Sequence, residues 1–342
     1  MKKKIVSIVA AIALLLTFLG CGVRESKAHS VFVHGGEVYV AGWQSGRGAI
    51  LWKNGVPKRL TDGKSYAEAR LVYVSGNDVY VSGHVGFMNT LWKNGVPQHF
   101  KEESRINSVF VSGEDVYIAG NEYHDNEGND AVLWKNDVKT VLGKGTVLSV
   151  YVSGKDVYAA GVSEREGKGF QTIPVVWKNG IFQSMPMIWG RADDNDLFVG
   201  EIECKEIKSV LVSGNDVYVA GYVKNPNTRA ENSFLCKNGK FYCWLIGFDE
   251  FSIPFFLGVG DWTMANSICI SGNDVYVAGT VRQPAGNRIA TFWKNGKPQR
   301  LSDGKNNAGA ESIFVSGGDV YVAGYEGNLA KIWKNGVSLS LK

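Results

Sequence analysis

Two stretches of the chain combine acidic and aromatic side chains in a way that suits ligand binding. They are residues 185–207 and 244–266, and both interrupt otherwise regular segments. Aromatic rings offer flat apolar surface and carboxylates bind hydroxyl groups or amines, so together they fit a sugar or a peptide. The candidate binding residues are Trp189, Asp193, Asp194, Asp196, Phe198, Trp244, Phe251 and Trp262. A ligand pocket, a contact with another protein, and packing of the insertions on themselves are three alternative interpretations of these residues.

Catalytic motifs do not occur in the sequence. The five histidines are scattered, and there is no Gly-x-Ser-x-Gly, P-loop or His-Glu-x-x-His sequence. Hydrolysis of a glycoside needs two carboxylates about 5–9.5 Å apart, which only the two insertions could supply, for example from Asp193, Glu201 and Asp261. The sequence therefore predicts a protein that is not an enzyme, with a glycan-active or other hydrolytic enzyme as the alternative.

Two short runs are rich in oxygen ligands, residues 125–130 and 193–196. Neither places a glycine at position six or a glutamate at position twelve, as a calcium-binding EF-hand loop does. No Cys-x-x-Cys spacing suggests zinc. We predict no metal and no cofactor, and a calcium-stabilised adhesin is a second alternative function.

Seven copies of one segment must position any such site. The first copy, residues 31–42, reads V-F-V-H-G-G-E-V-Y-V-A-G, and the second, residues 72–83, reads V-Y-V-S-G-N-D-V-Y-V-S-G. We number the repeats one to seven by their closing glycines, Gly42, Gly83, Gly120, Gly161, Gly221, Gly279 and Gly324. These glycines are 41, 37, 41, 60, 58 and 45 residues apart. Periods of about 40–50 residues with strand-like content indicate the blades of a propeller.

Each copy is followed by Trp-Lys-Asn-Gly or a close relative. The tryptophans are Trp52, Trp92, Trp134, Trp177, Trp293 and Trp333, and Cys236 replaces the tryptophan in the fifth repeat. Asn-Gly suits a two-residue hairpin turn, and Gly-Asn-Asp is a second turn signal, so each repeat reads as four short antiparallel strands, A to D. Strands A and B are apolar on both faces, which favours sheets packed between neighbours. We predict an all-β, seven-bladed β-propeller of four-stranded antiparallel blades over residues 30–342, with tryptophans in the core.

These repeats carry a family resemblance. The whole mature chain resembles bacterial lipoproteins built of V-S-G-N-D-V-Y-V-A-G…W-K-N-G repeats and is, more distantly, similar to WD40, kelch and YVTN-type propellers. The resemblance implies the propeller architecture but no particular activity.

The connections between strands differ in variability. The A–B and C–D turns are nearly the same in every repeat, whereas the B–C and D–A connections vary freely. In an antiparallel blade the first pair lies at one end, here called the uniform rim, and the second pair lies at the other, the variable rim. Both insertions are D–A connections, so the candidate binding residues belong to the variable rim. We expect the turn aspartates, such as Asp78, to accept N–H groups within their own turns.

The N-terminus reads as a leader. Lys2, Lys3 and Lys4 precede an uncharged run, residues 5–20, which is shorter than the roughly 20 residues of a membrane-spanning helix. The sequence Phe-Leu-Gly-Cys at 18–21 resembles the bacterial lipobox. We expect a signal peptide at 1–20, palmitate-type lipidation of Cys21, and a tether at 21–29; cleavage after Ala28 to give a secreted protein is the alternative. The other cysteines, Cys204, Cys236, Cys243 and Cys269, allow either disulfides or free thiols.

Charge gives little reason to expect a nucleic-acid partner. The chain has 37 basic and 33 acidic residues, and three of the basic ones lie in the leader. A nearly neutral surface without a basic run is not typical of nucleic-acid binding. Together these features predict a monomeric, lipid-anchored binding or scaffold protein of the bacterial cell envelope. Its partner would be an envelope protein or a glycan, held at the variable rim.

Overall fold

The computed structural model describes residues 25–100, 103–125, 128–164, 172–184, 203–224, 231–238, 240–242, 262–282 and 286–341. Every regular element in these ranges is a strand, so the all-β prediction is confirmed. A helix suited to crossing a membrane is not found among the described residues. The predicted leader and Cys21 lie outside them.

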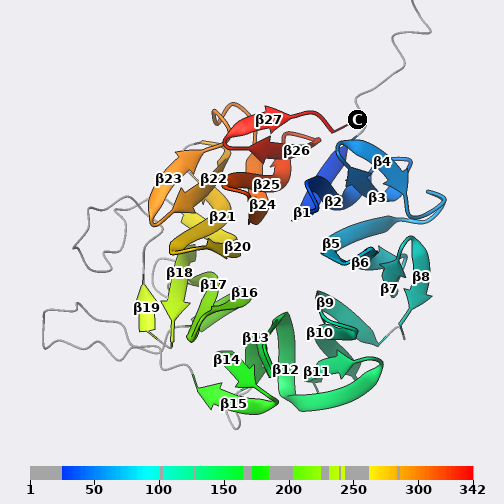
Figure 1. Cartoon of the computed structure of the whole chain (residues 1–342), viewed down its shortest axis with the longest axis vertical. Coiled ribbons are helices and arrows are strands. Elements are labelled where there is room, and N and C mark those ends of the chain that lie inside the picture. The colour runs from blue at the N-terminus through cyan, green and yellow to red at the C-terminus, as the bar shows by residue number, and fades with distance from the viewer. Residues whose placement is uncertain are drawn as a thin grey trace, which may run out of the picture.

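The strands form small antiparallel sheets arranged around a central axis, as Figure 1 shows. Within the described residues, five sheets contain four strands each, in chain order. They are β1 (Ser26–His34), β2 (Glu37–Gln44), β3 (Gly48–Lys53) and β4 (Val56–Arg59); β5 (Ala67–Ser75), β6 (Asp78–Val85), β7 (Met88–Lys93) and β8 (Val96–His99); β16 (Glu203–Ser213), β17 (Asp216–Lys224), β18 (Glu231–Lys237) and β19 (Lys240–Tyr242); β20 (Trp262–Ser271), β21 (Asp274–Arg282), β22 (Arg288–Lys294) and β23 (Lys297–Arg300); and β24 (Ala308–Ser316), β25 (Asp319–Glu326), β26 (Leu329–Lys334) and β27 (Val337–Leu339). The first strand of each sheet lies nearest the axis and the last lies outermost.

The third and fourth repeats depart from the prediction of separate four-stranded blades. Their strands form one seven-stranded sheet, made of β9 (Ser104–Ser112), β10 (Asp115–His124), β11 (Gly128–Lys135), β12 (Val138–Ser153), β13 (Asp156–Glu164), β14 (Thr172–Lys178) and β15 (Ile181–Ser184). The long strand β12 pairs with β11 through its first half and with β13 through its second half. Gly143 and Gly145 have φ values of 130° and 139° at the change of partner. The connection is thus short enough, and flexible enough at its glycines, for the strand to continue from one repeat into the next.

The turns of the uniform rim follow the predicted geometry. Asn54 and Gly55 both have positive φ, 51° and 77°, as a type I′ hairpin turn requires. In the second repeat Asn94 accepts the Val79 N–H at 2.9 Å and donates to Asp78 at 2.8 Å, while Lys93 lies 2.8 Å from the other Asp78 oxygen. Among the described residues the same Asp–Asn–Lys clamp recurs at Asp115, Asp156, Asp216, Asp274 and Asp319.

The clamp corrects the role expected of the turn aspartates. Each holds the neighbouring C–D turn to the A–B turn through bonds from that Asn and Lys, and in several repeats the tyrosine two residues later also donates to it. The first repeat has Glu37 instead, which pairs with Lys53 at 2.5 Å. Because the clamp uses side chains from both turns, it ties together the whole uniform edge of a repeat.

The tryptophans are core residues, as predicted. Trp52, Trp92, Trp177, Trp293 and Trp333 are each 1% exposed, Trp134 is 6% exposed, and Cys236 takes the same buried place in the fifth repeat. Each core cluster joins strands of adjacent repeats. For example, Trp92 packs with Tyr39 and Leu51 of the first repeat. Side chains therefore fill the space between neighbouring sheets, which explains why strands A and B are apolar on both faces.

Hydrogen bonds along the inner strands link one repeat to the next. Ser30 Oγ accepts the Val72 N–H at 3.2 Å, and Ser312 Oγ accepts the Val31 N–H at 3.2 Å. The second of these bonds joins the seventh repeat to the first. No strand is shared there within the described sheets. The contacts at the closure include this bond, the bond from the Ser26 N–H to the Asn328 carbonyl at 2.8 Å, the ion pair of Lys27 with Glu311 at 3.1 Å, and an apolar cluster with residues of both repeats.

Candidate functional site

The residues predicted to bind a ligand lie mostly outside the described part of the chain. Trp189, Asp193, Asp194, Asp196, Phe198, Trp244 and Phe251 fall in undescribed ranges. Trp262 is the first residue of β20, opposite Arg282 of β21. The binding site predicted at the two insertions therefore stays a prediction. The described residues show a different site at the variable rim.

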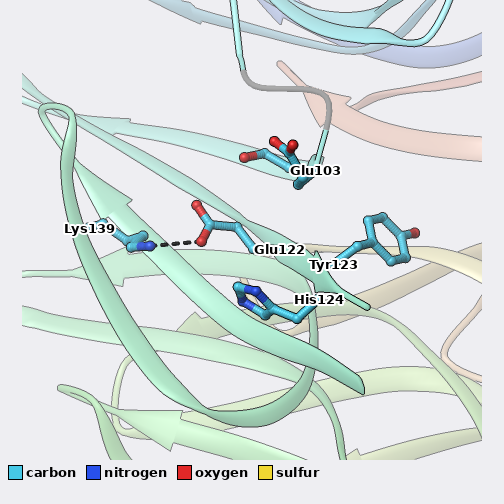
Figure 2. Close-up of a pocket in the computed structure, with 6 residues that line it drawn as sticks. Glu103, Glu122, Tyr123, His124 and Lys139 are labelled. Carbon is cyan, nitrogen blue, oxygen red and sulfur yellow. Dashed lines mark hydrogen bonds and ion pairs between the residues drawn. The ribbon is translucent and has the colours of Figure 1, made fainter. Parts of the chain in front are cut away.

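A cavity of about 440 Å³ opens at the variable rim of the third repeat. Figure 2 shows its lining, which comes from the start of β9, the end of β10 and the first half of β12. The lining residues are Glu103, Ser104, Glu122, Tyr123, His124 and Lys139. Carboxylate, imidazole and ammonium groups thus line one concave surface, whereas the Tyr123 hydroxyl points away from them.

An extended second strand builds this site. Strand β10 has ten residues, whereas β2 and β6 have eight. Glu122 lies opposite Asp130, at the position where β2 ends with Gln44, and the two extra residues continue the ladder with β11 to the pair His124–Gly128. Since side chains alternate along a strand, Glu122 and His124 lie on the same face of β10. His124 therefore joins Glu122 on one surface because β10 does not stop where β2 and β6 stop.

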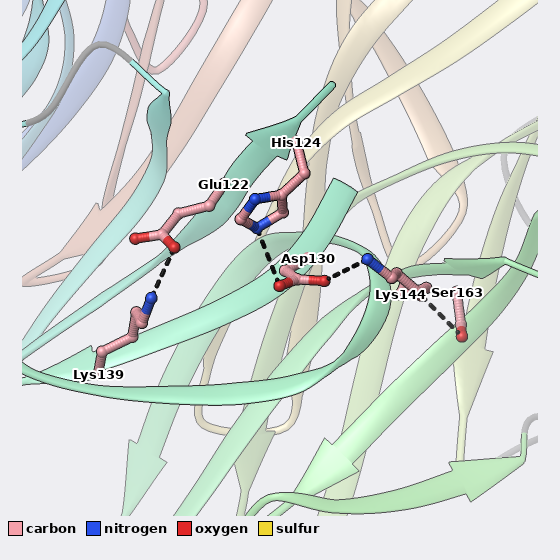
Figure 3. A network of polar contacts seen from close by, with 6 residues as sticks. All are labelled: Glu122, His124, Asp130, Lys139, Lys144 and Ser163. Carbon is pink, nitrogen blue, oxygen red and sulfur yellow. Dashed lines mark hydrogen bonds and ion pairs between the residues drawn. The ribbon is translucent and has the colours of Figure 1, made fainter. Parts of the chain in front are cut away.

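His124, Asp130 and Lys144 form a connected polar network, shown in Figure 3. The Nε2 atom of His124 lies 3.0 Å from Asp130 Oδ2, and the Lys144 ammonium lies 2.9 Å from Asp130 Oδ1. The hydrogen bond from Lys144 lowers the pKa of Asp130, and the charges of Lys144 and His124 add to this effect against the opposing effect of burial. Asp130 is therefore an acceptor at neutral pH, and Nε2 donates to it. In a neutral imidazole the other nitrogen, Nδ1, is then the basic one.

A second ion pair lies beside this network. Lys139 donates to Glu122 Oε2 at 2.7 Å, and the Glu122 side chain is only 15% exposed. Glu103 is exposed at the opposite wall of the cavity. The lining thus contains one carboxylate already neutralised by a lysine and another that faces solvent. Such an arrangement can orient a polar ligand that carries an amine.

Residues 125–130, considered above for calcium, include Asp130 of this network. Asp130 is bonded to a lysine and a histidine, which compete with a cation for its oxygen atoms. The expectation of no metal stays a prediction. Among the described residues no group of three or more His, Cys, Asp or Glu side chains could hold a metal ion. The useful signal was the alternation Glu-Tyr-His after Gly120, which predicts that the strand continues and puts an acid and an imidazole on one face.

Comparisons with known proteins identify the fold. No protein-family model matches, and no curated protein matches. Among solved structures, the chain is similar to a puromycin-hydrolysing peptidase from Mycobacterium tuberculosis, with a TM-score of 0.55 and 11% identity over 92% of this chain. It spans about half of that peptidase, 53%. It is also similar to the β-propeller domain of the Trilobed protease from Pyrococcus furiosus, described as having an open velcro topology, with a TM-score of 0.54 and 10% identity over 93% of this chain and 96% of that domain.

At such low identity these likenesses establish the β-propeller fold. They also contradict the prediction of a non-enzymatic binding or scaffold protein, since both neighbours are propellers of peptidases. The prediction that the chain is not an enzyme is likewise unsupported. It relied on motifs that are contiguous in sequence, whereas the imidazole and carboxylate of the third repeat meet only when β10 and β11 pair.

Proposed function

We propose that the chain is a hydrolase that cleaves a peptide-like substrate in the cavity of the third repeat. The observation that carries this proposal is the 3.0 Å contact between His124 Nε2 and Asp130 Oδ2 beside a cavity of about 440 Å³. A histidine oriented by a carboxylate is a standard general base. The similarity of the fold to propellers of peptidases supports hydrolysis as the reaction class.

The proposed reaction uses water as the nucleophile. His124 Nδ1 takes a proton from a water molecule as the water oxygen attacks the carbonyl carbon of the substrate. Asp130 stabilises the imidazolium that forms, and His124 then gives the proton to the leaving amine as the carbon–nitrogen bond breaks. General acid–base catalysis of this kind contributes about 10²–10⁴-fold to a rate.

The charges of the cavity indicate which substrates to try first. Glu103 is exposed in the lining, and Glu122 is held by Lys139. A free amine on the substrate would pair with Glu103, because an exposed carboxylate binds ammonium groups without a large desolvation penalty. We therefore infer a preference for substrates with a free α-amino group over N-acetylated ones.

The test is a comparison of hydrolysis by the full chain and two histidine variants. Fluorogenic aminoacyl and dipeptidyl amides, with N-acetylated counterparts, serve as substrates. His124→Ala should lower kcat/KM by at least 100-fold, whereas His34→Ala, an exposed histidine on the uniform rim, should leave it unchanged. No hydrolysis of any substrate by the unaltered chain, or full activity of His124→Ala, would overturn the proposal.

Two further proposals concern architecture and location. We infer that β12 serves both the third and the fourth repeat, so that the ring has seven blades with one strand continuous between two of them. We also propose that a lipid on Cys21 holds the ring at the bacterial envelope. Cys21→Ser should then move the protein from the membrane to the soluble fraction, and an unchanged membrane fraction would contradict the lipid anchor.

A further inference from the structure

A second polar cluster lies at the variable rim, on the inner strands of the seventh, first and second repeats. Each of these strands contains a β-bulge, and the bulged residues are Glu311, His29 and Arg70. A bulge leaves one residue outside the ladder and redirects its side chain. Three neighbouring repeats therefore present an acid, an imidazole and a guanidinium at equivalent positions.

The same position has a structural role in other repeats. Asn107 of the third repeat donates to the Val147 carbonyl of the fourth at 2.8 Å, and Asn266 of the sixth donates to the Ala310 carbonyl of the seventh at 2.9 Å. An asparagine at the bulge thus links adjacent repeats. At the equivalent position Glu311 and Arg70 make ion pairs, and His29 has a nitrogen without a hydrogen-bond partner among the described residues. In this part of the ring the bulge position therefore carries charged or titratable groups in place of an asparagine that links repeats.

Both signs of charge surround His29. Lys27 and Glu311 pair at 3.1 Å, with side chains 33% and 25% exposed. Arg70 Nε lies 3.4 Å from Glu68, whose other oxygen accepts a hydrogen bond from Tyr66. Burial opposes ionisation of Glu68, but the Tyr66 hydrogen bond and the neighbouring charges hold its pKa below the usual value. The cluster therefore combines two basic side chains with two acidic ones.

Two imidazole nitrogens in the cluster lack hydrogen-bond partners among the described residues. They are His29 Nε2 and His84 Nδ1, and both atoms are buried. Burial and the nearby Lys27 lower the pKa of His29 to about 4, so its ring is neutral at pH 7. Unsatisfied buried polar atoms are uncommon in folded proteins and call for an explanation. A polar ligand that bonds to these two nitrogens is one explanation, and it fits the charged side chains around them.

An aromatic wall lies next to these charges. The ring centre of Tyr66 lies 5.5 Å from that of His84 and 6.4 Å from that of Trp43, and Tyr66 is 62% exposed. Exposed rings of this kind can pack against an apolar or aromatic side chain of a ligand. Charges of both signs beside apolar surface match an amino acid with a large side chain.

We infer that Glu311, His29 and Arg70, with Lys27 and Glu68, form a binding site for a small zwitterion, a free amino acid with an aromatic side chain. Arg70 and Lys27 would hold its carboxylate, and Glu311 and Glu68 would hold its ammonium group. The site shares no residue with the cavity of the third repeat. It therefore stands whether or not the proposed hydrolysis is correct.

The test is calorimetric titration of the full chain with L-phenylalanine, which hydrolysis cannot consume. The matched probes are 3-phenylpropanoate and 2-phenylethylamine, here called the blocked forms, each of which lacks one charge and has no amide bond to hydrolyse. We expect each to bind at least tenfold more weakly. No heat with L-phenylalanine up to its solubility limit, or equal binding of the blocked forms, would overturn the inference. This comparison needs no altered protein.

Variants then locate the site. Arg70→Asn and Glu311→Asn introduce the residue that bulges naturally carry in the third and sixth repeats, so they should fold, which circular dichroism checks. Each should weaken L-phenylalanine about tenfold, because a charge-assisted bond is lost. Lys208→Asn, at the bulge of the fifth repeat, should bind as the unaltered chain does. Equal affinity of all three variants would contradict the assignment to these repeats.

Discussion

The two rims of the ring are built on the same strands but differ in what their side chains do. At the uniform rim one Asp–Asn–Lys clamp recurs from repeat to repeat with nearly the same distances, for example 2.8 Å from Lys93 to Asp78 and 2.7 Å from Lys294 to Asp274. At the variable rim equivalent positions hold different residues, such as Asn107, His29 and Arg70. The repeated contacts of the uniform rim hold the fold together. The residues that differ between repeats at the variable rim are the ones available for binding or catalysis.

The frame depends most on its buried tryptophans, and the second repeat offers a direct contrast. Trp92 is 1% exposed and Phe87, five residues earlier on the variable rim, is 93% exposed. Trp92→Ala should lower the free energy of unfolding by about 3–5 kcal/mol, because it leaves a cavity between two sheets. Phe87→Ala should change it by less than about 0.5 kcal/mol. Urea unfolding measures both, and equal effects would show that the rims are not distinct in this way.

The clamp asparagine should have the next largest effect. Asn94 has a φ of 56° and accepts the Val79 N–H, so Asn94→Ala loses a hydrogen bond and strains the turn, at a cost of about 1–2 kcal/mol. Asn94→Gly relieves the strain and should cost less. A similar ranking is expected at Asn295, where φ is 49°. Urea midpoints that differ widely between the two repeats would argue against a uniform frame.

The hydrogen bonds between repeats should contribute less. Ser312→Ala removes the acceptor of the Val31 N–H at the ring closure and should cost about 0.5–1.5 kcal/mol in urea unfolding. Ser30→Ala, which removes the equivalent bond between the first and second repeats, is the matched comparison. A much larger cost at Ser312 would show that the closure is weaker than the other contacts between repeats.

The smallest effect expected of a single residue in the uniform rim is on the pH dependence of stability. Hydrogen bonds from Lys93 and Asn94 lower the pKa of Asp78 from its ordinary 3.8. A carboxylate whose pKa is lower when folded stabilises the fold above that ordinary value and loses the contribution as pH falls through the lowered one. Urea midpoints should therefore decrease as the pH is lowered from 5 to 2, and they should decrease less for Asp78→Asn than for the unaltered chain. An equal decrease of the urea midpoint with pH in both proteins would contradict the role of the clamp in stability.

Much of the frame is predictable from sequence because it depends on local patterns. Val-Tyr-Val alternation, Asn-Gly turns and the recurring tryptophan each act within about a dozen residues, and the strands and buried tryptophans follow from them. The continuous strand β12 was not predicted, since residues 138–153 contain no marker that separates a turn from a bent strand. The chain positions of glycines alone do not reveal their φ values.

The sites at the variable rim were not predictable in the same way. His124 and Asp130 meet through the register of β10 and β11 across a loop, and Lys144 joins them from β12. His29 and Glu311 become neighbours only because the ring closes. The insertions attracted attention through composition, but most of their candidate residues lie outside the described ranges.

One pair of variants in the third repeat tests the division between the rims most directly. Asp130→Asn alters the variable rim and Asn136→Ala alters the uniform rim, six positions apart, and both proteins are assayed for kcat/KM and for the urea midpoint. We predict that Asp130→Asn loses at least tenfold in kcat/KM, because the imidazole loses its orienting carboxylate. Its midpoint should fall less than that of Asn136→Ala, because the ion pairs that it loses are partly exposed. Asn136→Ala should keep its kcat/KM and lose about 1–2 kcal/mol of stability, because the Val116 N–H loses its acceptor. Full activity of Asp130→Asn, or loss of activity in Asn136→Ala at equal folding, would contradict the account.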